Sequence, residues 1–112
     1  MAKQKVLVVE DEELMRNILR SLLERAGYEV FAADSGEAAL EIFAESDIAL
    51  TLTDIKMPGI DGLELLDQLK AIDPNATVIV MTGYSSVDSA VAALRKGAFD
   101  YITKPFVNED LL

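Results

Sequence analysis

The alternation of short apolar runs with helical patterns constrains the fold of this 112-residue chain more than any other feature. Five apolar runs have the length and composition of strands, and they occupy residues 5–10, 28–33, 48–52, 77–81 and 100–103. The first run, KVLVVE, has no polar position between its lysine and its glutamate, as expected for a strand covered on both faces. Strands that alternate with helices form a parallel sheet joined by right-handed crossovers. The sequence therefore predicts an α/β fold with helices on both faces of the sheet.

Helical periodicity fills the segments between these runs, and several residues mark where helices begin or end. The boundary signals are Gly27 and Gly97 as helix ends, Ser35 alone or Asp34 with Glu37 as a helix cap, and Pro74 after a helix over residues 63–72. Doubly wound sheets of five strands commonly have the order 2-1-3-4-5, and ligands bind at the carboxyl ends of strands 1 and 3. We predict this flavodoxin-like arrangement in a single domain over residues 1–112. Residues 108–112 match only the first turn of a fifth helix, which is therefore expected to be incomplete.

Composition excludes several classes of function. The chain has no cysteine and no histidine, so thiol chemistry, Cys/His zinc sites and histidine-dependent nucleophilic catalysis are ruled out, and any metal must be a hard ion bound by oxygen. A net charge of −10 disfavours binding to a phosphate backbone, so direct contact with nucleic acid is not expected. No apolar run approaches the roughly 20 residues that span a bilayer. We expect a cytoplasmic protein.

Three carboxylates follow the two strands that flank the predicted ligand crevice. Glu10 and Asp11 come at the end of the first apolar run, and Asp54 follows the third. Taken singly, Asp11 could cap a helix and Asp54 could cap a loop. Taken together, like charges this close require a counter-charge, and a set of oxygen ligands selects Mg²⁺ or a similar hard ion.

Two further polar residues follow the neighbouring strands. Thr82 comes directly after the fourth apolar run, where its hydroxyl could hydrogen-bond an oxyanion, and Lys104 comes after the fifth, where its ammonium could bind a phosphate. Each has an ordinary alternative role, as a turn residue or as a solvated surface charge. Metal-binding acids, an acid placed for attack, a hydroxyl and an ammonium together suit phosphoryl transfer.

Four motifs in order resemble the receiver (CheY-like) domain of two-component response regulators. They are VVEDE, TDIKMPGIDG, MTG and KGAFDYITKPF, and the resemblance runs from Lys5 to the C-terminus. It implies that Asp54 accepts a phosphoryl group from a histidine kinase or a phosphotransfer protein. It also implies a Mg²⁺ ion bound by Asp11 directly, by Glu10 through water and by the backbone carbonyl of Lys56. The acidic pair is Glu-Asp here, whereas Asp-Asp is commoner in the family.

The resemblance further implies a switch and an output. Thr82 and Lys104 would bind the phosphoryl oxygens, and Tyr101 would turn inward as Thr82 moves, which would change partner binding on the face made by helix 4, strand 5 and helix 5. Such a domain is a phosphoacceptor that assists its own phosphorylation and dephosphorylation, and it is not an enzyme acting on an external substrate. The C-terminal motifs are similar to those of receivers from enhancer-binding transcriptional activators, so an effector domain or protein is an expected partner. An incomplete fifth helix would expose apolar surface beside the first helix, with reduced stability or a homodimer as the expected result.

Two other classes of function remain as alternatives. A hydrolase of the haloacid-dehalogenase type would need a second aspartate two positions after the nucleophile, and that position holds Lys56. A flavodoxin-type cofactor site would need a Ser/Thr/Gly-rich loop after the first strand, where this chain has EDEE. A receiver fold that acts without phosphorylation is the closer alternative, although such a module would be expected to lack part of the acid, threonine and lysine set.

Overall fold

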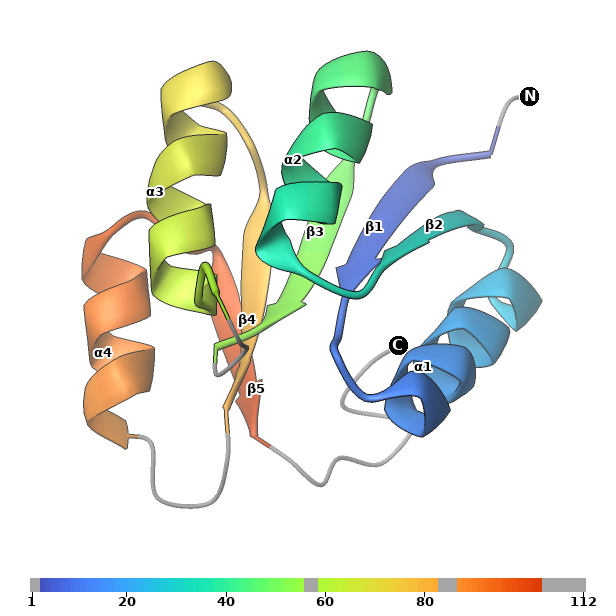
Figure 1. Cartoon of the computed structure of the whole chain (residues 1–112), viewed down its shortest axis with the longest axis horizontal. Helices are drawn as coiled ribbons and strands as arrows, with labels where there is room; N and C mark the ends of the chain where they lie inside the picture. The colour runs from blue at the N-terminus through green and yellow to red at the C-terminus, as the bar shows by residue number, and fades with distance from the viewer. Residues whose placement is uncertain (1–2, 56–58, 83–86, 104–112) are drawn as a thin grey trace.

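The core of the molecule is a parallel sheet of five strands in the order β2-β1-β3-β4-β5. The computed structural model describes residues 3–55, 59–82 and 87–103; the side chains of Thr82, Thr103 and residues 87–90 lie outside that description. In chain order the elements are β1 (Lys5–Val9), α1 (Glu13–Arg25), β2 (Glu29–Ala33), α2 (Gly36–Glu45), β3 (Leu50–Asp54), α3 (Gly62–Ile72), β4 (Val78–Thr82), α4 (Val87–Arg95) and β5 (Asp100–Thr103) (Figure 1). The predicted doubly wound fold and its strand order are therefore confirmed.

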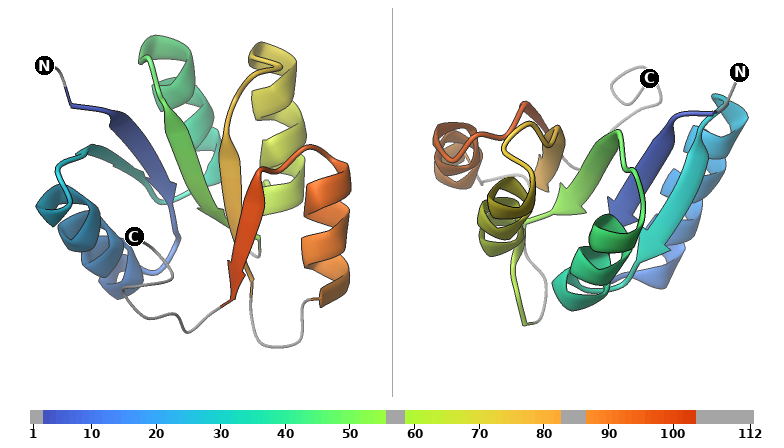
Figure 2. Two further views of the ribbon diagram at one scale, coloured as in Figure 1. Left: turned by 180° about the vertical axis from the view of Figure 1, so that it is seen from behind. Right: turned by 90° about the horizontal axis from the view of Figure 1, so that it is seen from above.

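Helices cover both faces of the sheet. Helix α1 lies on one face, and α2, α3 and α4 lie on the other, as the view from above makes clear (Figure 2). The first strand serves both layers, because Leu7 and Val9 belong to the core cluster under α2, α3 and α4, whereas Val6 and Val8 belong to the cluster under α1. Burial on both faces explains why this strand has no polar position in its interior.

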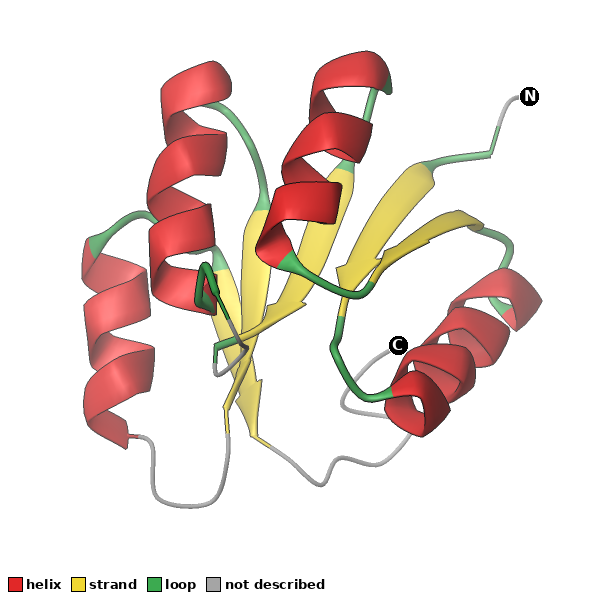
Figure 3. Cartoon of the chain, in the orientation of Figure 1, coloured by secondary structure: helices red, strands yellow, loops and turns green. Residues whose placement is uncertain are grey.

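Loops connect the strands and helices at both ends of the sheet (Figure 3). The strands all point the same way, so their carboxyl ends, including Val9 of β1 and Asp54 of β3, meet at one edge. The register places Val9 opposite Thr53, so the residues that follow them, Glu10 and Asp54, occupy equivalent positions on adjacent strands.

Most predicted boundaries agree with the structure. Gly27 and Gly97 follow α1 and α4 with φ angles of 101° and 104°, in the left-handed region that glycine adopts readily. Of the two proposed caps for α2, the structure has Ser35, whose Oγ accepts a hydrogen bond of 3.1 Å from the Ala38 amide. The third strand was expected at residues 48–52 but lies at Leu50–Asp54, because its extent is set by pairing with β1 and β4 and not by where the apolar run begins. Within the described residues, no helix is both long enough and apolar enough to cross a membrane.

Candidate phosphoacceptor and metal site

The turn between β1 and α1 presents two of the three candidate carboxylates. Glu10 is fully buried, and its backbone amide donates to the carbonyl of Ala33 in β2 at 3.1 Å. Its Oε2 accepts a hydrogen bond from the Glu12 amide at 3.2 Å. The next residue, Asp11, is exposed, and the N-cap of α1 is Glu12. Asp11 is therefore not the capping residue of α1, so the cap role that the sequence allowed for it is excluded.

Asp54 supplies the third carboxylate from the last position of β3. Its backbone pairs with Met81 of β4, and its side chain is half-buried. One carboxylate oxygen from each of Glu10, Asp11 and Asp54 can be chosen so that all three lie within 4.8 Å of one another. The sequence prediction that these three acids converge is borne out by this geometry.

The donor set suits a hard divalent cation. Three carboxylate oxygens at this spacing resemble the ligands that Mg²⁺ takes in proteins, and Mg²⁺ usually needs only one or two of them because it keeps several waters. The chain has no cysteine thiolate and no histidine imidazole, which argues against a softer transition metal. The residues present therefore fit the metal that the resemblance implies.

Gly62 lies against the end of β3, and sequence reasoning did not single it out. Its amide donates to the carbonyl of Ile55 at 2.6 Å. A Cβ atom at this position would overlap the Asp54 carbonyl oxygen and lie 2.6 Å from the Ile55 Cα. Only glycine allows the start of α3 to approach the backbone that carries Asp54. The glycine was visible in the motif GIDG, but its contact with Asp54 is a tertiary one.

The remaining predicted site residues are described in part. The backbone of Thr82 ends β4 opposite Thr103, the last residue of β5. Lys56 and Lys104 lie outside the described residues. Tyr101 is on β5 with 41 % of its surface exposed.

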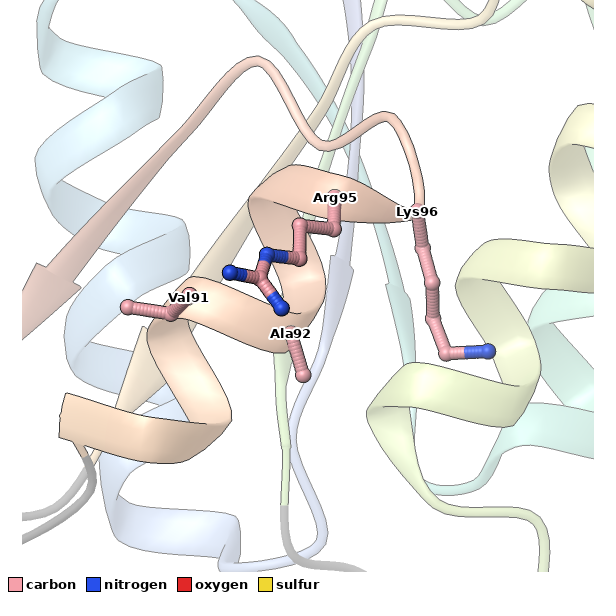
Figure 4. Close-up of a pocket in the computed structure, with 4 residues that line it drawn as sticks. All are labelled: Val91, Ala92, Arg95 and Lys96. Atoms are coloured by element: carbon pink, nitrogen blue, oxygen red, sulfur yellow. The ribbon is translucent and has the colours of Figure 1, made fainter.

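Exposed apolar side chains occur on α4, on β5 and on the segment that connects these two elements, which lie in contact with each other. Val91, Leu94, Phe99 and Tyr101 are all exposed, Phe99 by 72 %, and we call these four residues the α4–β5 surface. An open depression of about 530 Å³ on α4 is lined by Val91, Ala92, Arg95 and Lys96 (Figure 4). Lys96 extends toward α3, where its Nζ lies 2.8 Å from Asp67 Oδ2. Arg95, the other cationic residue that lines the depression, does not take part in that ion pair.

Comparison with known proteins identifies the family. The model of the response regulator receiver domain matches residues 6–112. Response regulator protein FleR of Pseudomonas aeruginosa is 44 % identical over 108 residues, which are 96 % of this chain and 23 % of that protein. DNA-binding transcriptional regulator NtrC of Escherichia coli is 44 % identical over 101 residues, 90 % of this chain and 22 % of that protein. The chain thus spans about a quarter of the length of these curated relatives.

Solved structures of receiver domains have the same fold as this chain. A response regulator receiver domain protein from Clostridium thermocellum superimposes with a TM-score of 0.93 at 39 % identity, covering 96 % of this chain and 87 % of that one. A CheY-like receiver domain protein from Methanospirillum hungatei gives a TM-score of 0.92 at 34 % identity, covering 98 % and 88 %. Fold, acidic cluster and relatives lead to one conclusion: the chain belongs to the response regulator receiver domain family of two-component systems.

Proposed function

We propose that Asp54 accepts a phosphoryl group from the phosphohistidine of a histidine kinase or phosphotransfer protein. The observation that carries this proposal is the convergence of the Glu10, Asp11 and Asp54 carboxylates within 4.8 Å at the carboxyl edge of the sheet. In the transfer, a carboxylate oxygen of Asp54 forms a bond to phosphorus while the phosphorus–nitrogen bond breaks. The bonding electrons remain on the imidazole nitrogen, which takes up a proton. The product is an acyl phosphate on Asp54.

Glu10, Asp11, Asp54 and the backbone carbonyl of Lys56 would hold Mg²⁺. When bound, Mg²⁺ supplies positive charge that offsets both the acidic cluster and the phosphoryl oxygens. The strand end keeps Asp54 in place, because its backbone is paired with β4 and α3 packs against it at Gly62. This rigidity favours attack, since catalysis of phosphoryl transfer depends mainly on positioning and charge neutralisation.

Thr82 and Lys104 would bind the phosphoryl oxygens. Support comes from position along the chain: Thr82 ends the strand beside β3, and Lys104 directly follows Thr103, whose backbone is paired with Thr82. Phosphorylation adds about two negative charges, which a hydroxyl and an ammonium can bind. The protein then acts as an acceptor that assists its own phosphorylation and dephosphorylation.

The output would be a change in binding at the α4–β5 surface. Val91, Leu94 and Phe99 are exposed apolar residues of these elements and their connection, and exposed apolar surface commonly marks sites of protein association. Tyr101 of β5 is also exposed and would turn inward as Thr82 moves toward the phosphoryl group. The downstream partner is proposed to be an effector domain or protein in transcription regulation, because the relative NtrC is a DNA-binding transcriptional regulator.

A phosphodonor experiment tests the acceptor directly. Protein incubated with Mg²⁺ and acetyl phosphate is expected to gain the mass of one phosphoryl group, and Asp54→Asn is expected to gain none. Asp47→Asn is the matched control, because Asp47 is an exposed acid beside Lys3 and Lys5, at the opposite edge of the sheet from the acidic cluster. A well-folded protein without Asp54-dependent mass gain would instead favour a receiver fold acting without phosphorylation, and steady turnover of a phosphoester would favour a hydrolase.

A further inference from the structure

Arg16 contacts the backbone that carries the acidic pair. One guanidinium nitrogen, Nη1, donates to the carbonyl oxygen of Glu10 at 2.9 Å and lies 3.5 Å from the carbonyl oxygen of Asp11. The side chain is half-buried and reaches back from α1 across the turn that connects this helix to β1. Its hydrogen-bond partners are thus carbonyl groups, where a surface arginine would commonly pair with a carboxylate.

At least three contacts hold Glu10 in place. Its amide donates to Ala33 of β2, its carbonyl accepts from Arg16 of α1, and its carboxylate accepts from the Glu12 amide. Two of these partners lie outside the turn, on different elements. The turn between β1 and α1 is therefore attached to the strand layer on one side and to the helix on the other.

We propose that Arg16 is a positioning residue for the metal site: by binding the carbonyls of Glu10 and Asp11 it sets the direction in which their carboxylates point. The inference rests on the Mg²⁺ site of the proposed function. Both contacts come from one nitrogen, Nη1, and the guanidinium plane fixes the directions of its N–H bonds, whereas the ammonium of a lysine rotates freely on a flexible stem. Mg²⁺ demands near-ideal octahedral geometry, so it is sensitive to small changes in the direction of its ligands.

Arg16 orients the metal ligands, which favours Mg²⁺ binding, but its positive charge disfavours Mg²⁺ binding. A guanidinium close to the acidic pair repels a divalent cation, so charge alone predicts that removing Arg16 would strengthen Mg²⁺ binding. Loss of orientation predicts weaker binding, and outer partners of metal ligands typically contribute about 10- to 100-fold in affinity. Because Arg16 is partly exposed, water and salt screen its charge, and we expect the loss of orientation to dominate.

The test is a calorimetric titration of the folded protein with Mg²⁺ and, separately, with Ca²⁺. Arg16→Met is expected to bind Mg²⁺ about 10-fold more weakly than the wild type. Arg16→Lys keeps the positive charge, and its Mg²⁺ affinity is expected to lie between those of the wild type and Arg16→Met. Ca²⁺ accepts irregular coordination, so its affinity is expected to fall less than that of Mg²⁺. Arg20→Met is the matched control, because Arg20 lies one turn further along α1 and pairs with Glu24 at 3.6 Å on the exposed side of the helix.

Each outcome decides between the explanations. Unchanged or tighter Mg²⁺ binding by folded Arg16→Met would overturn the proposal, as would Arg16→Lys binding like the wild type or an equal loss in Arg20→Met. A variant that is merely less stable would unfold at a lower temperature yet bind Mg²⁺ normally below that temperature, which also contradicts it. Should Arg16→Met fail to fold, the comparison of Arg16→Lys with the wild type decides. Failure of the wild type itself to bind Mg²⁺ would overturn the metal site and this inference together, whereas wild-type binding without an Arg16 effect would overturn only the latter.

Discussion

At the scale of single residues, the site depends on backbone contacts as much as on carboxylates. Gly62 has no side chain, yet it determines how closely α3 approaches the segment that carries Asp54. Arg16 and Arg20 show that such backbone contacts cannot be read from the sequence. Both are α1 arginines four positions apart, and nothing in the periodicity distinguishes the one that binds the Glu10 carbonyl from the one that pairs with Glu24. The acids themselves were predictable, because they follow the strands that flank the crevice.

Gly62→Ala is expected to lower both stability and Mg²⁺ affinity. The added methyl group overlaps the Asp54 carbonyl, so the backbone must shift, and overpacking of this kind costs roughly 1–3 kcal/mol. Gly27→Ala is the control. It forces alanine into a left-handed conformation at φ 101° but meets no atom within 4 Å, so it should cost roughly 1–2 kcal/mol without touching the site. Chemical denaturation and metal titration of both variants check this, and equal Mg²⁺ affinity in the two would contradict it.

At the scale of helices and strands, the periodicity of apolar residues predicted which segments are helices and which are strands. The exact residues at which these elements begin and end depend on strand pairing and on helix caps. The third strand ends two residues later than its apolar run because Asp54 still pairs with Met81. Between the two caps that the sequence offered for α2, only geometry could decide, since Asp34 and Ser35 are adjacent residues of a capping type. At the start of α3, the Asp61 side chain accepts from the Glu64 amide at 2.9 Å, a cap that sits one residue before Gly62.

Ser35→Ala is expected to lower the free energy of unfolding by about 1 kcal/mol, because it leaves the Ala38 amide without its capping oxygen. Ser21→Ala provides a comparison of the opposite sign. Ser21 is exposed within α1, where alanine has the higher helix propensity, so stability should rise by up to roughly 0.5 kcal/mol. Urea denaturation measures both changes. Unchanged or increased stability of Ser35→Ala would show that the cap contributes nothing.

At the scale of the whole molecule, metal binding and folding are coupled through the acidic cluster. The three carboxylates converge only when β1 and β3 are paired, so the unfolded chain has no such site. A ligand that binds only the folded state stabilises it, by about 2.7 kcal/mol at a concentration 100 times its Kd. Without the cation, repulsion among the acids acts against folding.

Mg²⁺ is therefore expected to raise the melting temperature of the wild type, and Asp11→Asn is expected to respond much less. In the absence of Mg²⁺ the same variant should be slightly more stable than the wild type, by about 1 kcal/mol or less, because Asp11 is exposed and its repulsion is screened. Asp47→Asn, far from the site, should behave like the wild type in its response to Mg²⁺. Thermal unfolding with and without Mg²⁺ measures all three, and an equal Mg²⁺ response in Asp11→Asn would argue against Asp11 as a ligand.

Because β1 is buried on both faces, its apolar side chains do not by themselves fix its register with the neighbouring strands. Leu7 and Val9 belong to one apolar cluster, and Val6 and Val8 belong to the other. A shift of β1 by one residue in its register with β3 would therefore still bury apolar side chains on both faces of the sheet. Hydrophobicity alone is thus a poor guide to alignment here. Glu10 adds information about the alignment, because a shift of β1 by one position in either direction would move Glu10 out of register with Asp54. The acid proposed as a metal ligand would therefore also favour one alignment of β1 with β3.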